Sequence, residues 1–190
     1  MTDDPLIDVL NAAVKVLDAE GVPYAVTGSV ASSILGEPLS SIDVDLVVRM
    51  TSKQARRVAG ALPRRFYCTE EMLVEAAANA GMVNLIDQET RFKVDISVLA
   101  HTPFFDKVMT RRAPMKFGPD GPSFYVVSAE DIILMKLLWR KDSRSQKQWE
   151  NALGVVRVRG AALDWKYMFQ QAAQLGISED LEKLRDEGGI

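Results

Sequence analysis

The stretch "TGSVASSILGEPLSSIDVDLVV", residues 27–48, sets a Gly-Ser pair ahead of two aspartates that interrupt a run of isoleucine, valine and leucine. In a strand, residues two apart face the same side, so Asp43 and Asp45 share one face of "IDVDLVV" and the apolar residues share the other. A dry, unpaired carboxylate is costly, and a second one nearby adds repulsion. The stretch therefore predicts a strand whose polar face meets a positive partner.

A second stretch, "RFKVDISV" at residues 91–98, repeats this alternation. Asp95 shares one face with Lys93 and Ser97, and the apolar residues take the other. If both strands belong to one sheet, Asp43, Asp45 and Asp95 converge on one polar patch, whose oxygen ligands suit Mg²⁺ or Mn²⁺. The alternative is that the aspartates line a solvated sheet face and need no partner.

The Gly-Ser pair lies between an expected strand at residues 23–28 and an expected helix that begins at Ser29 and ends at Gly36. The first N–H groups of a helix have no partner within it, and the helix dipole favours an anion there. Gly28 lets the backbone approach a phosphate, and the Ser29 hydroxyl can donate a further hydrogen bond. A phosphate cradle followed by a carboxylate pair is typical of a site for a Mg²⁺-bound nucleotide.

The composition is that of a globular protein. Of 190 residues, 47% are hydrophobic and 26% are charged, which excludes disordered and fibrous classes. The acidic start of the chain lacks the regions of a secretory signal, and no apolar run reaches the length of a membrane span. We expect a cytoplasmic protein that is not bound to membranes. The net charge of −3 also argues against bulk electrostatic binding of nucleic acid.

The chain has one cysteine, Cys68, and one histidine, His101. A disulfide within the chain is therefore impossible, and a zinc site of histidines and cysteines would lack ligands. Cys68 has no histidine near it in the sequence, so we expect a small packing residue and not a nucleophile. Any metal chemistry must use oxygen ligands.

Helical and strand patterns alternate up to about residue 127, and helical patterns alone follow. We expect helices at residues 5–20, 29–36, 52–62, 69–81, 128–141, 145–160, 163–176 and 178–187. We expect strands at residues 23–28, 42–48, 82–87 and 91–98, with further short strands within 107–117 and 123–128. This predicts an α/β domain over residues 1–127 and a C-terminal helical subdomain over residues 128–190, packed on it.

The order of these features resembles the nucleotidyltransferase superfamily, which has the DNA polymerase β-like fold. The shared pattern is a strand, Gly28-Ser29, a helix, Asp43-Val44-Asp45 in a strand, and a distal third acid, Asp95. Thirteen residues separate Ser29 from Asp43, and the match covers roughly residues 5–100. The resemblance implies an α/β fold with a mixed sheet flanked by helices.

The helices after residue 127 resemble the C-terminal part of small bacterial and archaeal nucleotidyltransferase-like proteins, including relatives of the AbiEii toxins. In these proteins the helix that matches "EDIILMKL" supplies a lysine near the active site, which corresponds to Lys136. Two departures are visible. Leu39-Ser40-Ser41 stands where many such proteins have Arg-x-Thr, and Asn151 beside Glu150 stands where many have an aspartate. Either change could weaken nucleotide binding or mark an altered substrate.

The resemblance implies Mg²⁺- or Mn²⁺-dependent transfer of an NMP group from ATP or another NTP to an acceptor hydroxyl, with release of pyrophosphate. Asp43, Asp45 and Asp95 are then the metal ligands and catalytic acids, and Asp95 helps to deprotonate the hydroxyl. Gly28 and Ser29 seat the triphosphate as nucleotide-binding residues. Lys136 neutralises the charge that develops on it.

Two other classes of protein stay open. A catalytically degenerate protein of this fold could bind a nucleotide or a partner protein, such as an antitoxin in a toxin–antitoxin pair. A plain α/β interaction domain with an acidic patch is the third possibility. The acceptor of an active enzyme could be tRNA or another RNA, a protein side chain, or a small molecule such as an aminoglycoside. The basic run from Lys136 to Lys147 favours a polyanionic acceptor but could equally serve the triphosphate.

Overall fold

The computed structural model describes residues 4–38, 43–118 and 121–190 of the chain. The chain forms two compact units. The first comprises Met1–Thr27 and Ser41–Val126, and the second comprises Gly28–Ser40 and Val127–Ile190. The predicted division into a domain over residues 1–127 and a helical subdomain over residues 128–190 stays a prediction.

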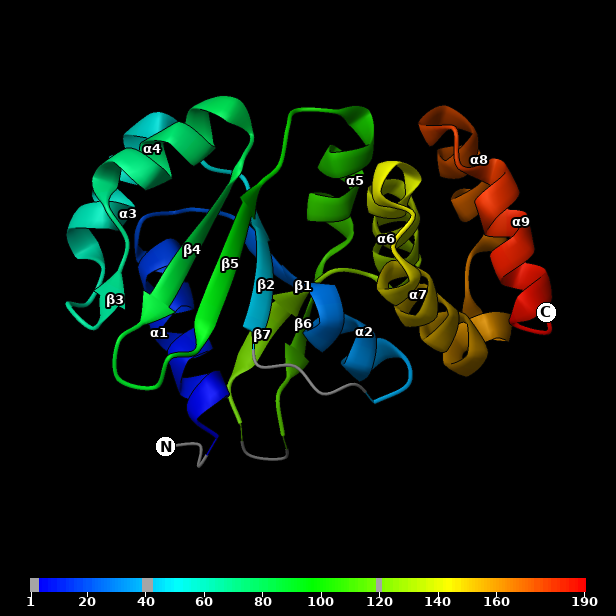
Figure 1. Cartoon of the computed structure of the whole chain (residues 1–190), viewed down its shortest axis with the longest axis horizontal. Coiled ribbons are helices and arrows are strands. Elements are labelled where there is room, and N and C mark those ends of the chain that lie inside the picture. Colours follow the sequence, from blue (N-terminus) through cyan, green and yellow to red (C-terminus); the bar gives the residue numbers. More distant parts are fainter. Residues whose placement is uncertain (1–3, 39–42, 119–120) are drawn as a thin grey trace. The chain divides into compact units, whose positions relative to one another are not determined.

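The first unit is built on a seven-stranded sheet in the order β3-β4-β5-β2-β1-β7-β6 (Figure 1). Its strands are β1 Tyr24–Thr27, β2 Asp43–Val48, β3 Phe66–Tyr67, β4 Met82–Asp87, β5 Lys93–Val98, β6 Ala113–Lys116 and β7 Ser123–Val126. Two neighbouring pairs, β2 with β5 and β1 with β7, are parallel, and the other pairs are antiparallel. This mixed sheet with its flanking helices confirms the predicted fold class.

Within its described residues, the first unit has four helices: α1 Pro5–Ala19, α3 Ser52–Ala61, α4 Glu70–Asn79 and α5 Pro103–Arg111. Helices α1 and α4 pack against strands of the sheet, and α3 packs against both helices. The alternate strand residues that form the core under them are buried: Val44, Leu46, Val83, Leu85, Val94 and Ile96. The opposite face of β2, β5 and β4 is only half-buried at Asp45, Asp95 and Asn84, so the polar residues lie on the other side of the sheet from this core.

Helix α5 differs from the sequence prediction. We expected short strands within residues 107–117, but residues 107–111 are helical and only β6 forms in this stretch. Thr102 caps the helix, because its hydroxyl accepts a hydrogen bond from the Phe105 N–H at 3.2 Å. Pro103 occupies the first turn, where its missing N–H carries no cost. The cap and the proline outweigh the strand preference of the residues that follow.

The described part of the second unit is helical. Its helices are α2 Gly28–Leu35, α6 Ala129–Ser143, α7 Gln146–Arg159, α8 Trp165–Leu175 and α9 Ser178–Glu187, with a 3₁₀ turn at Gly160–Ala162 (Figure 1). Helix α2 packs against both α6 and α7. A Cβ added at Gly36 would lie 2.7 Å from the Val155 Cα, so only glycine lets the end of α2 approach the α7 backbone this closely.

Helix α6 is the central helix of the second unit. Ser128 caps it by accepting a hydrogen bond from the Asp131 N–H at 3.1 Å. Its apolar residues are completely buried around most of its circumference: Ile132, Ile133, Leu134, Met135 and Leu137. A helix that is apolar on most sides must have packing partners on most sides.

Among the described residues, no helix combines the length and the apolar character needed to cross a membrane.

Candidate functional site

The polar face of the sheet carries a row of four side chains, which we call the carboxylate row. Thr27 of β1 lies opposite Asp45 of β2, Asp45 lies opposite Asp95 of β5, and Asp95 lies opposite Asn84 of β4. Neighbouring strands are about 4.8 Å apart, and residues directly opposite each other share a face of the sheet. The row therefore sets two carboxylates side by side, with a hydroxyl at one end and an amide at the other.

Asp43 lies on the same face as the carboxylate row, two residues before Asp45. Two strand residues rise about 7 Å, so Asp43 stands one step along β2 from the row. Its register partner on β5 is Lys93. Residues that pair across neighbouring strands lie on the same face of the sheet. Lys93 thus places a positive charge beside the first aspartate of the pair.

The strand registers bring Asp43, Asp45 and Asp95 onto one face of the sheet. Among the residues that the structure describes, however, no group of three or more His, Cys, Asp and Glu side chains is arranged to hold a metal ion. Asp95 accepts a hydrogen bond from the side-chain amide of Asn84, and neighbouring carboxylates repel each other. The metal-ligand roles of the three acids stay a prediction.

The donor set still fits a hard divalent cation. Mg²⁺ prefers oxygen ligands, keeps several waters, and binds through one or two carboxylates together with substrate phosphates. It therefore needs no cage made only of protein side chains. Asp45 and Asp95, side by side on neighbouring strands, match this mode of binding.

Two members of the carboxylate row, Thr27 and Asn84, were not predicted from the sequence. Thr27 is buried, and its Oγ1 has no hydrogen-bond partner within the described part of the protein. A buried hydroxyl without a partner is uncommon in folded proteins and is a feature that a ligand can explain. Asn84 is a polar residue in the apolar segment "MVNLID", and that irregularity is the signal that could have found it.

In the second unit, helix α2 begins at Gly28, whose φ of +67° lies in the region that favours glycine. Ser29 is buried, and its Oγ accepts a hydrogen bond from the Asn151 Nδ2 on α7 at 3.3 Å. The Ser32 hydroxyl donates to the Gly28 carbonyl at 2.9 Å. Because Asn151 donates to the Ser29 oxygen, the hydroxyl proton of Ser29 remains available for a different acceptor.

Lys136 lies on α6 and is only 3% exposed. Its burial rules out a side chain that extends freely into solvent, and a buried ammonium group needs polar or anionic partners. Asp131, also on α6, is completely buried and accepts a hydrogen bond from the Tyr167 hydroxyl at 2.6 Å. Helix α6 therefore carries buried charged groups of both signs in a largely apolar helix.

The six predicted site residues divide between the two units. Asp43, Asp45 and Asp95 lie in the first unit, and Gly28, Ser29 and Lys136 lie in the second. The two sets are joined in the chain by the peptide bond between Thr27 and Gly28. The departure at Leu39-Ser40-Ser41 lies outside the described residues.

The basic run on α6 and α7 is partly occupied by contacts within the second unit. The Arg140 guanidinium lies 4.8 Å from the centre of the Trp149 ring and 3.6 Å from the Asp180 carboxylate. Lys141 donates to the Leu175 carbonyl at 3.3 Å. These contacts show that part of the basic run stabilises the helical unit, which weakens the case for a continuous polyanion-binding surface.

Cys68 is half-buried, and this burial raises the pKa of its thiol to about 11. The thiolate is the reactive form of cysteine, and a thiol with such a pKa stays protonated near neutral pH. This agrees with the expectation that Cys68 is a packing residue.

Known structures show which fold this is. An antigenic nucleotidyltransferase-like protein from Paracoccidioides brasiliensis is similar with a TM-score of 0.56 and 17% identity, over 98% of this chain and 94% of that one. The antibiotic-resistance factor ANT(2'')-Ia is similar with a TM-score of 0.60 and 14% identity, over 96% and 97% of the two chains. No protein-family model and no curated protein matches the sequence. The chain thus has a nucleotidyltransferase-like fold, and its predicted relation to the AbiEii toxins stays a prediction.

Proposed function

We propose that the protein is a nucleotidyltransferase, which moves an NMP group from ATP or another NTP to an acceptor hydroxyl and releases pyrophosphate. The observation that carries this proposal is the register of β2 and β5, which sets Asp45 opposite Asp95 with Asp43 on the same face. A nucleotidyltransferase-like fold around these acids supports it. The NTP substrate is also consistent with the cytoplasmic location expected from the sequence.

The acids have distinct tasks in this proposal. Asp43, Asp45 and Asp95 would hold Mg²⁺ or Mn²⁺, which supplies positive charge for the attacking and leaving oxygens when bound. Asp95 also accepts the proton of the acceptor hydroxyl as it attacks the α-phosphorus. The hydrogen bond from Asn84 to Asp95 Oδ1 restrains the orientation of this carboxylate.

Gly28, Ser29 and Lys136 would bind the triphosphate in this proposal. The N–H groups at the start of α2 and the free hydroxyl proton of Ser29 donate to phosphate oxygens, and Gly28 lets the backbone come close. Lys136 balances the negative charge that grows on the leaving pyrophosphate. A well-placed donor of this kind is worth roughly 2.7–4 kcal/mol in the transition state.

Two measurements test the proposal. Thermal melting with each NTP, with and without Mg²⁺, should show a metal-dependent rise in Tm with at least one nucleotide. The protein is then incubated with that NTP labelled at the α- or the γ-phosphate, together with total RNA, a protein lysate or hydroxylated small molecules. Nucleotidyl transfer labels an acceptor from the α-phosphate only. Labelling from the γ-phosphate alone would show a kinase instead.

The second candidate is a nucleotide-binding protein of the same fold that has lost transfer activity and acts on a partner protein, as in a toxin–antitoxin pair. The feature that favours it is Leu39-Ser40-Ser41, which stands where many nucleotidyltransferase-like proteins have Arg-x-Thr. This candidate predicts a thermal shift with an NTP but no labelled acceptor under any of the conditions above. A plain interaction domain predicts no nucleotide-dependent shift at all.

A further inference from the structure

Strand β4 leaves part of its outer edge without a neighbouring strand. β3 pairs with β4 only at Asp87 and Ile86. Within the described part of the chain, residues 82–85 therefore have β5 on one side and no strand on the other. At about 3.3 Å per residue, this open edge is about 13 Å long.

The backbone hydrogen bonds show which residues of β4 face this edge. Two bonds connect the strand to the β5 side, each 2.9 Å long: Val98 N–H to the Gly81 carbonyl, and Asp87 N–H to the Phe92 carbonyl. In an antiparallel ladder, the main-chain groups of alternate residues point to opposite sides. Gly81 and Asp87 thus belong to the set of alternate residues whose main-chain groups point to β5. Met82 and Asn84 belong to the other set and direct their N–H and C=O groups to the open edge.

A groove runs beside the open edge. It encloses about 330 Å³ between α4 and β4, and its helical wall is formed by Met72, Glu75, Ala76 and Asn79. These four residues follow the helical spacing that places them on one face of α4. An added strand in the plane of the sheet would therefore have this helix face over one of its sides.

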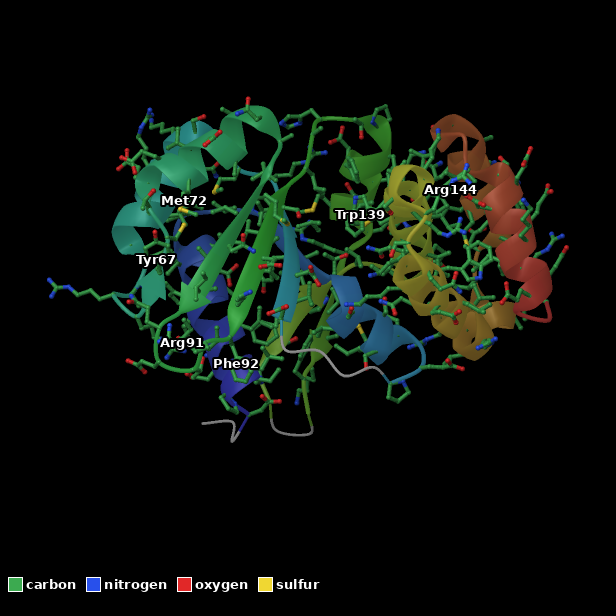
Figure 2. All side chains as sticks on the ribbon, viewed as in Figure 1. Tyr67, Met72, Arg91, Phe92, Trp139 and Arg144 are labelled. Atoms are coloured by element: carbon green, nitrogen blue, oxygen red, sulfur yellow. The ribbon has the colours of Figure 1, made fainter. Side chains whose placement is uncertain are left out.

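Two large apolar side chains of the groove lining, Met72 and Met82, are exposed, and so is Tyr67 on β3, outside the lining. Met82 is 63% exposed, and Tyr67 at the end of β3 is 55% exposed. Met72 on α4 is 36% exposed, and Figure 2 labels Tyr67 and Met72 on the two elements that flank the edge. Exposed apolar side chains gathered at one place mark interaction surfaces more often than scattered ones do.

The opposite edge of the sheet has the features that prevent strand addition. β6 contains Pro114 and ends at Lys116, and proline and lysine are residues that natural proteins use to block edge strands. Residues 82–85 of β4 are Met-Val-Asn-Leu and include neither. The two edges of the same sheet thus differ in whether they admit another strand.

We propose that the open edge of β4 binds an extended peptide segment of a partner protein as an additional strand. Apolar side chains of the peptide face Met72 and Ala76, and lysine or arginine side chains face Glu75. The charge preference follows from the groove, since Glu75 is its one titratable lining residue and Glu71 lies one helical turn before it. A second copy fits less well, because β3 closes the edge from Ile86 onward and leaves only four residues for a two-fold pairing.

The test uses the full-length protein and a library of randomised octapeptides. We expect wild-type protein to enrich peptides that carry apolar residues and a lysine or arginine at positions two apart, because side chains two apart face α4 together. Met82→Pro removes one outward N–H and should retain Tm, since proline is tolerated where the N–H faces away from the sheet. It should bind the enriched peptides about tenfold more weakly. Glu75→Lys should retain Tm and shift the enriched peptides toward aspartate and glutamate.

Hydrogen exchange locates the bound peptide. In the complex with the most enriched peptide, the amides of Met82 and Asn84 should become protected, while those of Val83 and Leu85 should change little. Equal enrichment by wild type and Met82→Pro overturns the proposal, and so does protection elsewhere. A dimeric mass in light scattering, with Met82 and Asn84 protected before any peptide is added, assigns the edge to a second copy and also overturns it. None of these outcomes depends on nucleotidyl transfer.

Discussion

Asp45 of β2 and Asp95 of β5 lie directly opposite each other on parallel strands, although they are 50 positions apart in the sequence. The segment between them includes α3, β3, α4 and β4, so this pairing depends on the closure of a long crossover. Two facing carboxylates repel each other unless a positive charge lies near. A divalent cation bound at the two carboxylates, as in the proposed function, would offset this repulsion.

The first prediction concerns Asp45→Asn. Removal of one of two facing charges should leave the Tm of the protein without Mg²⁺ and nucleotide unchanged or slightly raised, because repulsion falls. The Mg²⁺-dependent part of the NTP-induced thermal shift should disappear, and label transfer should fall about a hundredfold or more. Asp18→Asn, at an exposed position on α1, is the matched control and should change neither. A large loss of Tm in Asp45→Asn would instead assign the carboxylate a structural role.

The second prediction concerns the hydrogen bond between Asn151 and Ser29. In Asn151→Asp the carboxylate can only accept a hydrogen bond, so the Ser29 hydroxyl donates to it instead of to a phosphate, and a negative charge is added beside the hydroxyl. We expect NTP binding to weaken by about tenfold, in line with the loss of a hydrogen bond to a charged group. Asn151→Ala leaves the hydroxyl proton free and should weaken binding less. Titration calorimetry measures both, and equal affinities for the two variants would contradict this role of Asn151.

The third prediction concerns Gly28. Its positive φ is strained for alanine, so Gly28→Ala should lower the free energy of unfolding by about 1–2 kcal/mol. Gly60→Ala on α3 is the matched control, because an added Cβ there meets no atom within 4 Å. It should raise stability by about 0.5–1 kcal/mol. Urea unfolding measures both, and a neutral Gly28→Ala would show that the backbone can relax at this position.

The fourth prediction concerns Lys136. Lys136→Met keeps most of the side-chain volume but removes the charge, so the NTP-induced thermal shift and the transfer rate should both fall. Lys136→Arg should recover part of the transfer rate, because the positive charge returns. If both variants lose Tm but bind NTP as wild type does, Lys136 serves the packing of α6 and not the nucleotide.

The fifth prediction concerns acid stability. Asp87 is completely buried, and this burial raises the pKa of its carboxyl. Hydrogen bonds from the Thr90 N–H and hydroxyl, together with the charge of Arg65, lower the pKa. The resulting pKa lies below the usual value for aspartate. The unfolded chain therefore binds this proton more readily, and the stability that Asp87 contributes is lost as the pH falls from about 4 through the folded pKa. Asp87→Asn should be less stable at pH 7 and show a shallower loss of stability in acid, as measured by urea unfolding from pH 2 to 7.

Local features of the fold were readable from the sequence. The alternation in "IDVDLVV" and "RFKVDISV" assigned Asp43, Asp45 and Asp95 to the polar faces of their strands, because side-chain direction in a strand repeats every two residues. Helices such as α1 and α9 were predicted closely, since their apolar spacing and their start and stop residues lie within a few positions. The two-residue strand β3 was missed, because so short a segment carries no periodicity.

The tertiary structure alone decided which of these residues meet. The sequence determined that Asp45 and Asp95 face out from a buried strand side, but strand order and register made them neighbours and added Thr27 and Asn84. The tertiary structure also places Asn151 beside Ser29, which is 122 positions away in the sequence. Periodicity is encoded over a few residues, whereas register depends on packing and loop closure over the whole chain. The sequence thus determined which polar side chains the strands carry, and the tertiary structure determined which of these side chains are neighbours.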